Sequence, residues 1–68
     1  MTDLIDLDNG EYTAVVDSIE DGFATVFFER GGEEVGNAVL EADRLPKDGH
    51  HADAVLTVTV VNSDLDTV

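Results

Sequence analysis

The chain of 68 residues contains no cysteine, which excludes disulfide bonds and any zinc site built from thiolates. It also has no apolar run near the roughly 20 residues that a membrane-spanning helix requires. The basic region followed by an apolar stretch that marks a secretory signal peptide is absent as well. We therefore expect a cytoplasmic protein that does not associate with membranes.

Basic residues are also scarce. Three Lys and Arg side chains stand against 16 Asp and Glu, which gives a formal net charge of -13 and a pI near 4.1. Carboxylates crowded on a small body repel one another and oppose compaction. The Debye length falls from about 8 Å at physiological ionic strength to about 3 Å near 1 M salt, so concentrated salt relieves this repulsion. We predict a halophilic protein for which nucleic acid is an unfavourable partner.

The apolar content nevertheless supports a folded domain. Hydrophobic residues make up 43% of the chain and lie in clustered, mostly β-branched runs, which favours a core over disorder. A chain this short allows one small core, so we expect salt, a partner or a dimer to add to its stability. The predicted organisation is an acidic, partly flexible leader over residues 1–10 and a single β-barrel domain over residues 11–68.

Five segments have the composition of short strands, with turn residues such as Asp21-Gly22 between them. The predicted strands cover residues 12–19, 23–30, 33–40, 54–61 and 65–68. This spacing is typical of an all-β fold, here a small five-stranded antiparallel barrel of the SH3-like or OB-like kind. Residues 41–45, before Pro46, are expected to form one short helical turn, and a helix over residues 38–45 is the alternative.

Alternation along the strands separates an inner face from an outer face. The side chains expected to point inward are Ala24, Val26, Phe28, Leu56, Val58 and Val60. Those expected to point outward are Phe23, Thr25, Phe27, Val55, Thr57, Thr59 and Val61. In the first strand, Val15 and Ile19 fall on one face by alternation, whereas Ala14 and Val16 fall on the other. A bulge near Asp17 and Ser18 would shift the alternation by one residue and bring both parts of the strand into agreement.

Two stretches resemble a known family. Residues 12–22 (YTAVVDSIEDG) and the corner at residues 45–49 (LPKDG) are similar to domain-of-unknown-function family 3006, and the resemblance spans residues 11–67. Ser18 and Ala52 stand where that family usually has arginine and glycine. The resemblance, with the acidic charge, implies a small β-rich domain of the haloarchaeal type. Some members lie beside, or are fused to, metallo-β-lactamase-fold hydrolases, and the family transfers no catalytic residue.

No motif points to catalysis or to a bound cofactor. His50 and His51 are neighbours, so in an extended segment they point to opposite sides and cannot readily share a metal. Residues 6–10 fail as a calcium loop because its ligand positions fall on apolar side chains. Neither Ser18 nor Ser63 lies in a nucleophile motif. We predict a protein without enzymatic activity and without catalytic, cofactor-binding or metal-ligating residues.

The outer face of the strands is the candidate functional surface. Its predicted interaction residues are Phe23, Phe27, Val55 and Val61. Exposed apolar patches usually mark an interface, so we predict a protein-interaction or accessory module. The resemblance implies a metallo-β-lactamase-fold hydrolase as its partner, and a homodimer is a further expectation. The alternative is a single-stranded nucleic-acid-binding barrel that stacks bases on the two phenylalanine rings.

Overall fold

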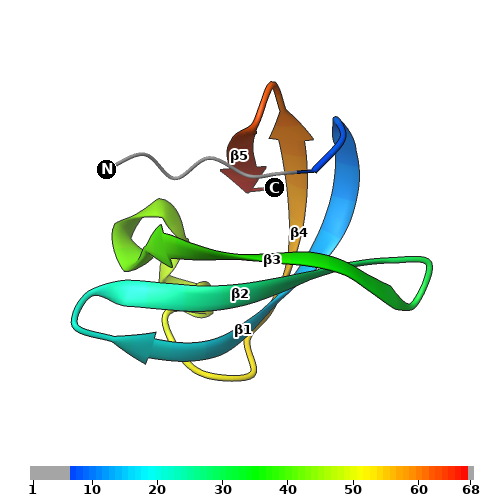
Figure 1. The fold of residues 1–68 in the computed structure, drawn as a ribbon. Helices are drawn as coiled ribbons and strands as arrows, with labels where there is room; N and C mark the ends of the chain where they lie inside the picture. The colour runs from blue at the N-terminus through cyan, green and yellow to red at the C-terminus, as the bar shows by residue number, and fades with distance from the viewer. Residues whose placement is uncertain (1–6, 68) are drawn as a thin grey trace.

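The computed structural model describes residues 7–67, most of which lie in five antiparallel strands (Figure 1). The strands are β1 (Gly10–Glu20), β2 (Phe23–Arg30), β3 (Glu33–Glu41), β4 (Val55–Val61) and β5 (Asp64–Thr67). The predicted all-β class and the five predicted strands are therefore confirmed. Residues 1–6 of the predicted leader and Val68 of the last predicted strand lie outside the described residues.

Three strand connections are turns of two residues. The pairs Asp21-Gly22, Gly31-Gly32 and Asn62-Ser63 all have positive φ angles, between 52° and 81°. Two successive positive φ angles are the mark of a type I′ turn, whose twist matches that of the strands it joins. Gly, Asn and Asp adopt this conformation at low cost. Local turn chemistry therefore sets the β1–β2, β2–β3 and β4–β5 hairpins.

Strand β1 is the central strand of the sheet and pairs with a neighbour on each side. The strand order is β3-β2-β1-β4-β5, and β1 pairs with β4 over residues 10–15 and with β2 over residues 13–20. Its register against β2 shifts between Val16 and Ser18, which confirms the predicted bulge. A bulge bends the strand that contains it, and the sheet curls into a half-barrel in which β3 and β5 are the edge strands (Figure 1).

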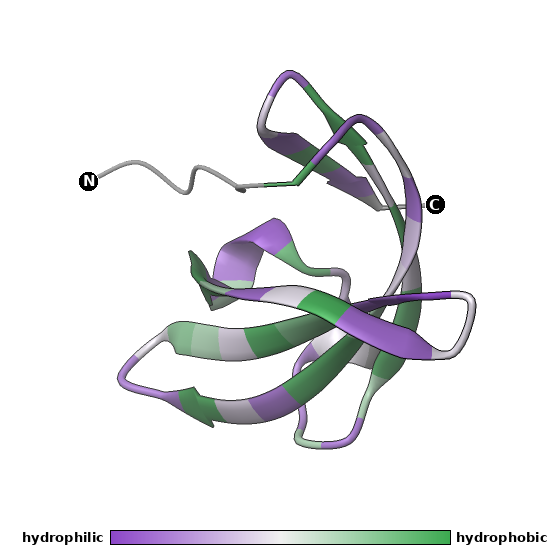
Figure 2. Ribbon diagram, turned by 45° about the vertical axis from the view of Figure 1, so that its right-hand side comes forward, coloured by the Kyte–Doolittle hydropathy of each residue, from purple (hydrophilic) through white to green (hydrophobic). Residues whose placement is uncertain are grey.

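The concave face of this half-barrel holds the core. Its buried side chains are Tyr12, Ala14, Val16, Ala24, Val26, Phe28, Leu40, Leu45, Ala54, Val58, Val60 and Leu65. The predicted inward phases of β2 and β4 are confirmed, with Leu56 half-buried at the margin. The Tyr12 ring meets Phe28 edge-on at 6.5 Å, and its hydroxyl donates to the Asp8 carbonyl oxygen at 2.7 Å. Hydrophobic and hydrophilic residues alternate along the strands in Figure 2.

The β3–β4 connection consists of two short 3-10 turns, η1 (Ala42–Arg44) and η2 (Lys47–Gly49). The helical turn predicted at residues 41–45 is confirmed. The alternative helix over residues 38–45 does not form, since β3 continues to Glu41. Leu40 lies opposite Ala24 and is fully buried, so pairing and burial outweigh the helix propensity of this stretch. Leu45, also buried, ties the connection to the core.

Candidate functional site

Val15 lies at the centre of the outer, convex face of the sheet. It is opposite Phe27 of β2 on one side and Val55 of β4 on the other. Because neighbouring strands are about 4.8 Å apart, these three side chains form one row across three strands. Val15 and Phe27 are half-buried, and Val55 is 66% exposed. The row is an apolar ridge that is open to solvent.

Val39 and Phe23 extend this row along β3 and β2. Val39 lies opposite Thr25, which places it diagonally across from both Phe23 and Phe27, at about 7–8 Å. Val39 is 59% exposed and Phe23 is 47% exposed. We call this set the apolar outer patch: Val15, Phe23, Phe27, Val39 and Val55.

Three of the four predicted interaction residues belong to the patch, and the fourth does not. Val61 follows Val55 by six residues on β4, a separation of about 20 Å along a strand. It is 46% exposed and lies opposite Asp64 beside the β4–β5 turn. Val61 is therefore an exposed apolar residue outside the apolar outer patch.

Sequence reasoning missed Val15 and Val39. The bulge at Asp17 interrupts the alternation of β1, so the outward phase of Val15 cannot be followed along the strand. Val39 falls in the stretch that has a helical alternative. Their common signal is the cross-strand register, because pairing places both residues beside Phe27.

The other end of the outer face is polar. Thr13 lies opposite Thr57 of β4 and Glu29 of β2. A cleft of about 240 Å³ opens at this end of the sheet, lined by these three outer residues and by Glu11 and Gly31, together with Tyr12 and Arg30 from the core side. The hydroxyls and carboxylates of this lining can bind polar groups.

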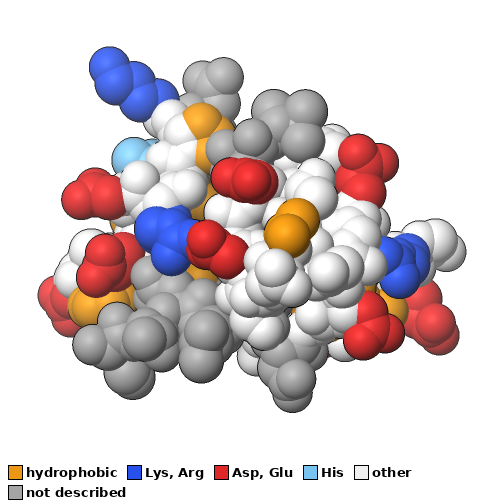
Figure 3. Space-filling view, turned by 90° about the horizontal axis from the view of Figure 1, so that it is seen from above, with side chains coloured by type: hydrophobic (Ala, Val, Ile, Leu, Met, Phe, Trp, Pro, Cys, Tyr) orange, Lys and Arg blue, Asp and Glu red, His pale blue; other side chains and the backbone are white. Residues whose placement is uncertain are grey.

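Carboxylates adjoin the apolar outer patch. Phe23 lies between Glu20 of β1 and Glu41 of β3, each directly opposite it. The strand register places further carboxylates on the same face: Glu11, Glu29, Glu34, Asp64 and Asp66. In the strands as described, no Lys or Arg occupies an outer position. Asp and Glu side chains are spread over the surface seen from above in Figure 3.

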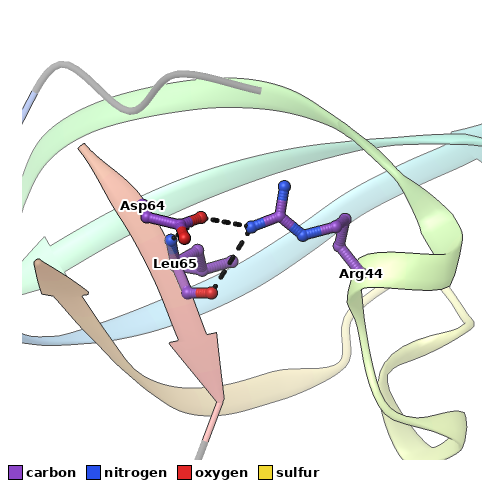
Figure 4. A network of polar contacts seen from close by, with 3 residues as sticks. All are labelled: Arg44, Asp64 and Leu65. Carbon is purple, nitrogen blue, oxygen red and sulfur yellow. Dashed lines mark hydrogen bonds and ion pairs between the residues drawn. The ribbon is translucent and has the colours of Figure 1, made fainter. Parts of the chain in front are cut away.

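Arg44 joins the β3–β4 connection to β5 (Figure 4). Its Nη2 donates to Oδ1 of Asp64 at 2.6 Å and, at a longer 3.5 Å, to the carbonyl oxygen of Leu65. The same Asp64 oxygen accepts the Leu65 backbone N–H at 2.9 Å. The backbone hydrogen bond and, after it, the Arg44 guanidinium hold the pKa of Asp64 below its ordinary value. The ion pair between Arg44 and Asp64 therefore links η1 to the edge strand β5.

The two histidines have separate partners. Nε2–H of His50 donates to the Leu45 carbonyl oxygen at 2.7 Å, and Nδ1 of His51 lies 2.9 Å from the Ala52 carbonyl oxygen. Among residues 7–67, no three His, Cys, Asp or Glu side chains gather closely enough to hold a metal ion. Nor does that part of the chain contain a helix long and apolar enough to cross a membrane.

Comparisons with protein-family models, with curated proteins and with solved structures give no match. The resemblance to domain-of-unknown-function family 3006 therefore stays a prediction. The functional proposal is based on the apolar outer patch and the carboxylates beside it.

Proposed function

We propose that this protein is a non-catalytic protein-interaction module that binds its partner through the apolar outer patch. The observation that carries the proposal is the continuity of five apolar side chains across four strands, three of them between 47% and 66% exposed. Exposed apolar surface is unfavourable in water until another surface covers it. A contiguous patch of this kind on a small folded protein usually marks an interface.

The charge of the chain supports a cytoplasmic setting of high salt, in which the 16 carboxylates are screened. Screening weakens contacts that depend on charge alone, so an interface in such a setting benefits from apolar burial at its centre. The resemblance to domain-of-unknown-function family 3006 suggests an accessory role beside a metallo-β-lactamase-fold hydrolase.

Matched valine variants test the proposal. Val39→Ser with Val55→Ser removes two exposed methyl-bearing side chains from the patch, whereas Val61→Ser makes the same change outside it. In co-purification from native high-salt extract, we expect the wild type and Val61→Ser to recover one stoichiometric partner and the double variant to lose it. Equal recovery by all three proteins, or repeated recovery of none, would contradict the proposal.

A second function, binding of single-stranded nucleic acid, has one observation in its favour. Phe23 and Phe27 lie on the same face of β2, and aromatic rings on a strand can stack bases. Glu20 and Glu41 beside Phe23 oppose it, because they repel phosphates. Oligonucleotide binding in molar KCl that is lost in Phe27→Ala would support this function. No binding at high micromolar protein would exclude it.

A further inference from the structure

We infer that the partner segment which covers the apolar outer patch carries a Lys or Arg side chain, seated over Phe23 between Glu20 and Glu41. The inference rests on the proposed function and adds the chemistry of the occupant. It divides the patch into two parts: an apolar part at Val15, Phe27 and Val55, and a cation-binding end at Phe23.

The cation-binding end follows from the register of three strands. Glu20 and Glu41 are each paired with Phe23, on its two sides. Adjacent strands are about 4.8 Å apart, so the two glutamate positions stand about 10 Å apart with the aromatic ring between them. All three residues are exposed. A ring face attracts a cation, and a carboxylate on either side adds charge-assisted hydrogen bonds to an ammonium or guanidinium group.

The chain does not supply this cation itself from its described strands or turns. The guanidinium carbon of Arg30 lies 4.2 Å from the centroid of the Tyr12 ring, on the core side of the sheet. Arg44 is bonded to Asp64 and Leu65. Lys47 lies in η2, and within the described residues it forms no ion pair with Glu20 or Glu41. The carboxylates beside Phe23 are therefore open to a cation from another molecule.

Charge also distinguishes a second copy of the chain from a different partner, because charges buried together in an interface are screened by salt much less than exposed ones. On its strand register the outer face carries seven carboxylates, of which Asp64 is paired with Arg44, and no Lys or Arg occupies a described outward position of the strands. A two-fold contact through this face would place one such array against an identical one, and like charges in an interface disfavour association. A basic segment has the complementary sign, so it fits this face better than a second copy.

The geometry also sets the spacing of the occupant's side chains. Phe23 and Phe27 are four residues apart on one face of β2, a distance of about 13 Å along a strand. An extended partner segment would therefore carry its basic residue about four positions from the centre of its apolar row. In a helix, with a rise of about 1.5 Å per residue, the same distance is about nine residues.

Two synthetic peptides test the inference by NMR titration of the full ¹⁵N-labelled chain, at the lowest KCl concentration that keeps it folded. One is an acetylated peptide of alternating Thr and Val, about nine residues long, with Lys replacing its first Val. The other has Gln in place of that Lys. We expect the Lys peptide to shift the amides of the apolar outer patch and to bind roughly fivefold more tightly than the Gln peptide.

The carboxylates are tested with two double variants that remove equal charge. Glu20→Gln with Glu41→Gln should abolish the preference for the Lys peptide, whereas Glu11→Gln with Glu29→Gln, at the polar end of the same face, should keep it. Equal loss in both double variants would mean that the attraction is the general charge of the face, and would overturn the cation-binding end.

The remaining outcomes separate this inference from the proposed function. Equal binding of both peptides at the patch would overturn the inference and leave the interaction module in place. If millimolar peptide shifts none of the amides of the apolar outer patch, the inference is also overturned. The proposed function is then still tested independently by co-purification with the valine variants. A dimer in light scattering that Val39→Ser with Val55→Ser dissociates and Val61→Ser does not would identify a second copy as the occupant.

Discussion

The guanidinium group of Arg30 lies over the ring of Tyr12, with its central carbon 4.2 Å from the ring centroid. Tyr12 is 5% exposed and packs edge-on against Phe28, so Arg30 covers one end of the core. Gly10 makes room for this contact, because a Cβ at that position would collide with Nη2 of Arg30. The contact joins the start of β1 to the end of β2.

Loss of this contact should lower the free energy of unfolding. We expect Arg30→Gln to destabilise the fold by about 0.5–1 kcal/mol, the usual range for a cation–π contact at a partly exposed site. Lys47→Gln removes the same charge from η2 and serves as the control for electrostatic repulsion. Urea unfolding measures both variants, and an equal effect of the two would show that the stacking contributes nothing.

Neighbouring residues of β3 should differ sharply in their tolerance to truncation. Leu40 is fully buried opposite Ala24, whereas Val39 is 59% exposed. We expect Leu40→Ala to cost about 2–5 kcal/mol, since it leaves a cavity in the core. Val39→Ala should stay within about 0.5 kcal/mol. Similar losses in the two variants, measured by chemical denaturation, would contradict the assignment of inner and outer faces.

The Arg44–Asp64 pair should make stability depend on pH at the acidic end. The pKa of Asp64 in the fold is lowered, first by the Leu65 backbone N–H and then by Arg44. Because the unfolded chain titrates near its ordinary value of about 3.9, the charged form stabilises the fold above that pH. This contribution is lost as the pH falls through the lower pKa of the folded state.

Asp64→Asn should therefore lower the Tm at neutral pH and have a diminishing effect below about pH 3.9. Asp66→Asn removes an equal charge from the same strand and serves as the control. Thermal melts across the acidic range measure both variants. A Tm difference between Asp64→Asn and the wild type that stays constant down to the acid limit would show that the ion pair does not act in this way.

Salt should stabilise the whole domain. With a formal net charge of -13, the Tm is expected to rise markedly between about 0.1 M and 2 M KCl as screening shortens the range of repulsion. Circular dichroism melts measure this, and a neutral osmolyte at matched osmolality separates screening from exclusion effects. An unchanged Tm across that range of KCl would remove the argument for a halophilic protein.

Much of the fold follows from features that act over a few residues. Turn pairs such as Asp21-Gly22 adopt positive φ angles at low cost, and each one joins two strands in a fixed register. The inward phase of β2 and β4 follows from alternation alone, because successive side chains point to opposite faces. The acidic character of the protein could also be predicted without the structure, since the excess of carboxylates is a property of composition.

The candidate site required the tertiary structure, because it depends on which strands lie side by side. Val15 is near Val55 only because β1 pairs with β4, which is distant in the sequence, and its place opposite Phe27 depends on the register shift between Val16 and Ser18. The β1–β2 and β2–β3 pairings set Glu20 and Glu41 beside Phe23, and Val61 lies apart at the β4–β5 turn. By itself the sequence determined the strands, the tight turns and the acidic surface. Only the sheet's register and curl decided which outward residues meet, because contacts between distant strands arise from long-range pairing rather than from local preference.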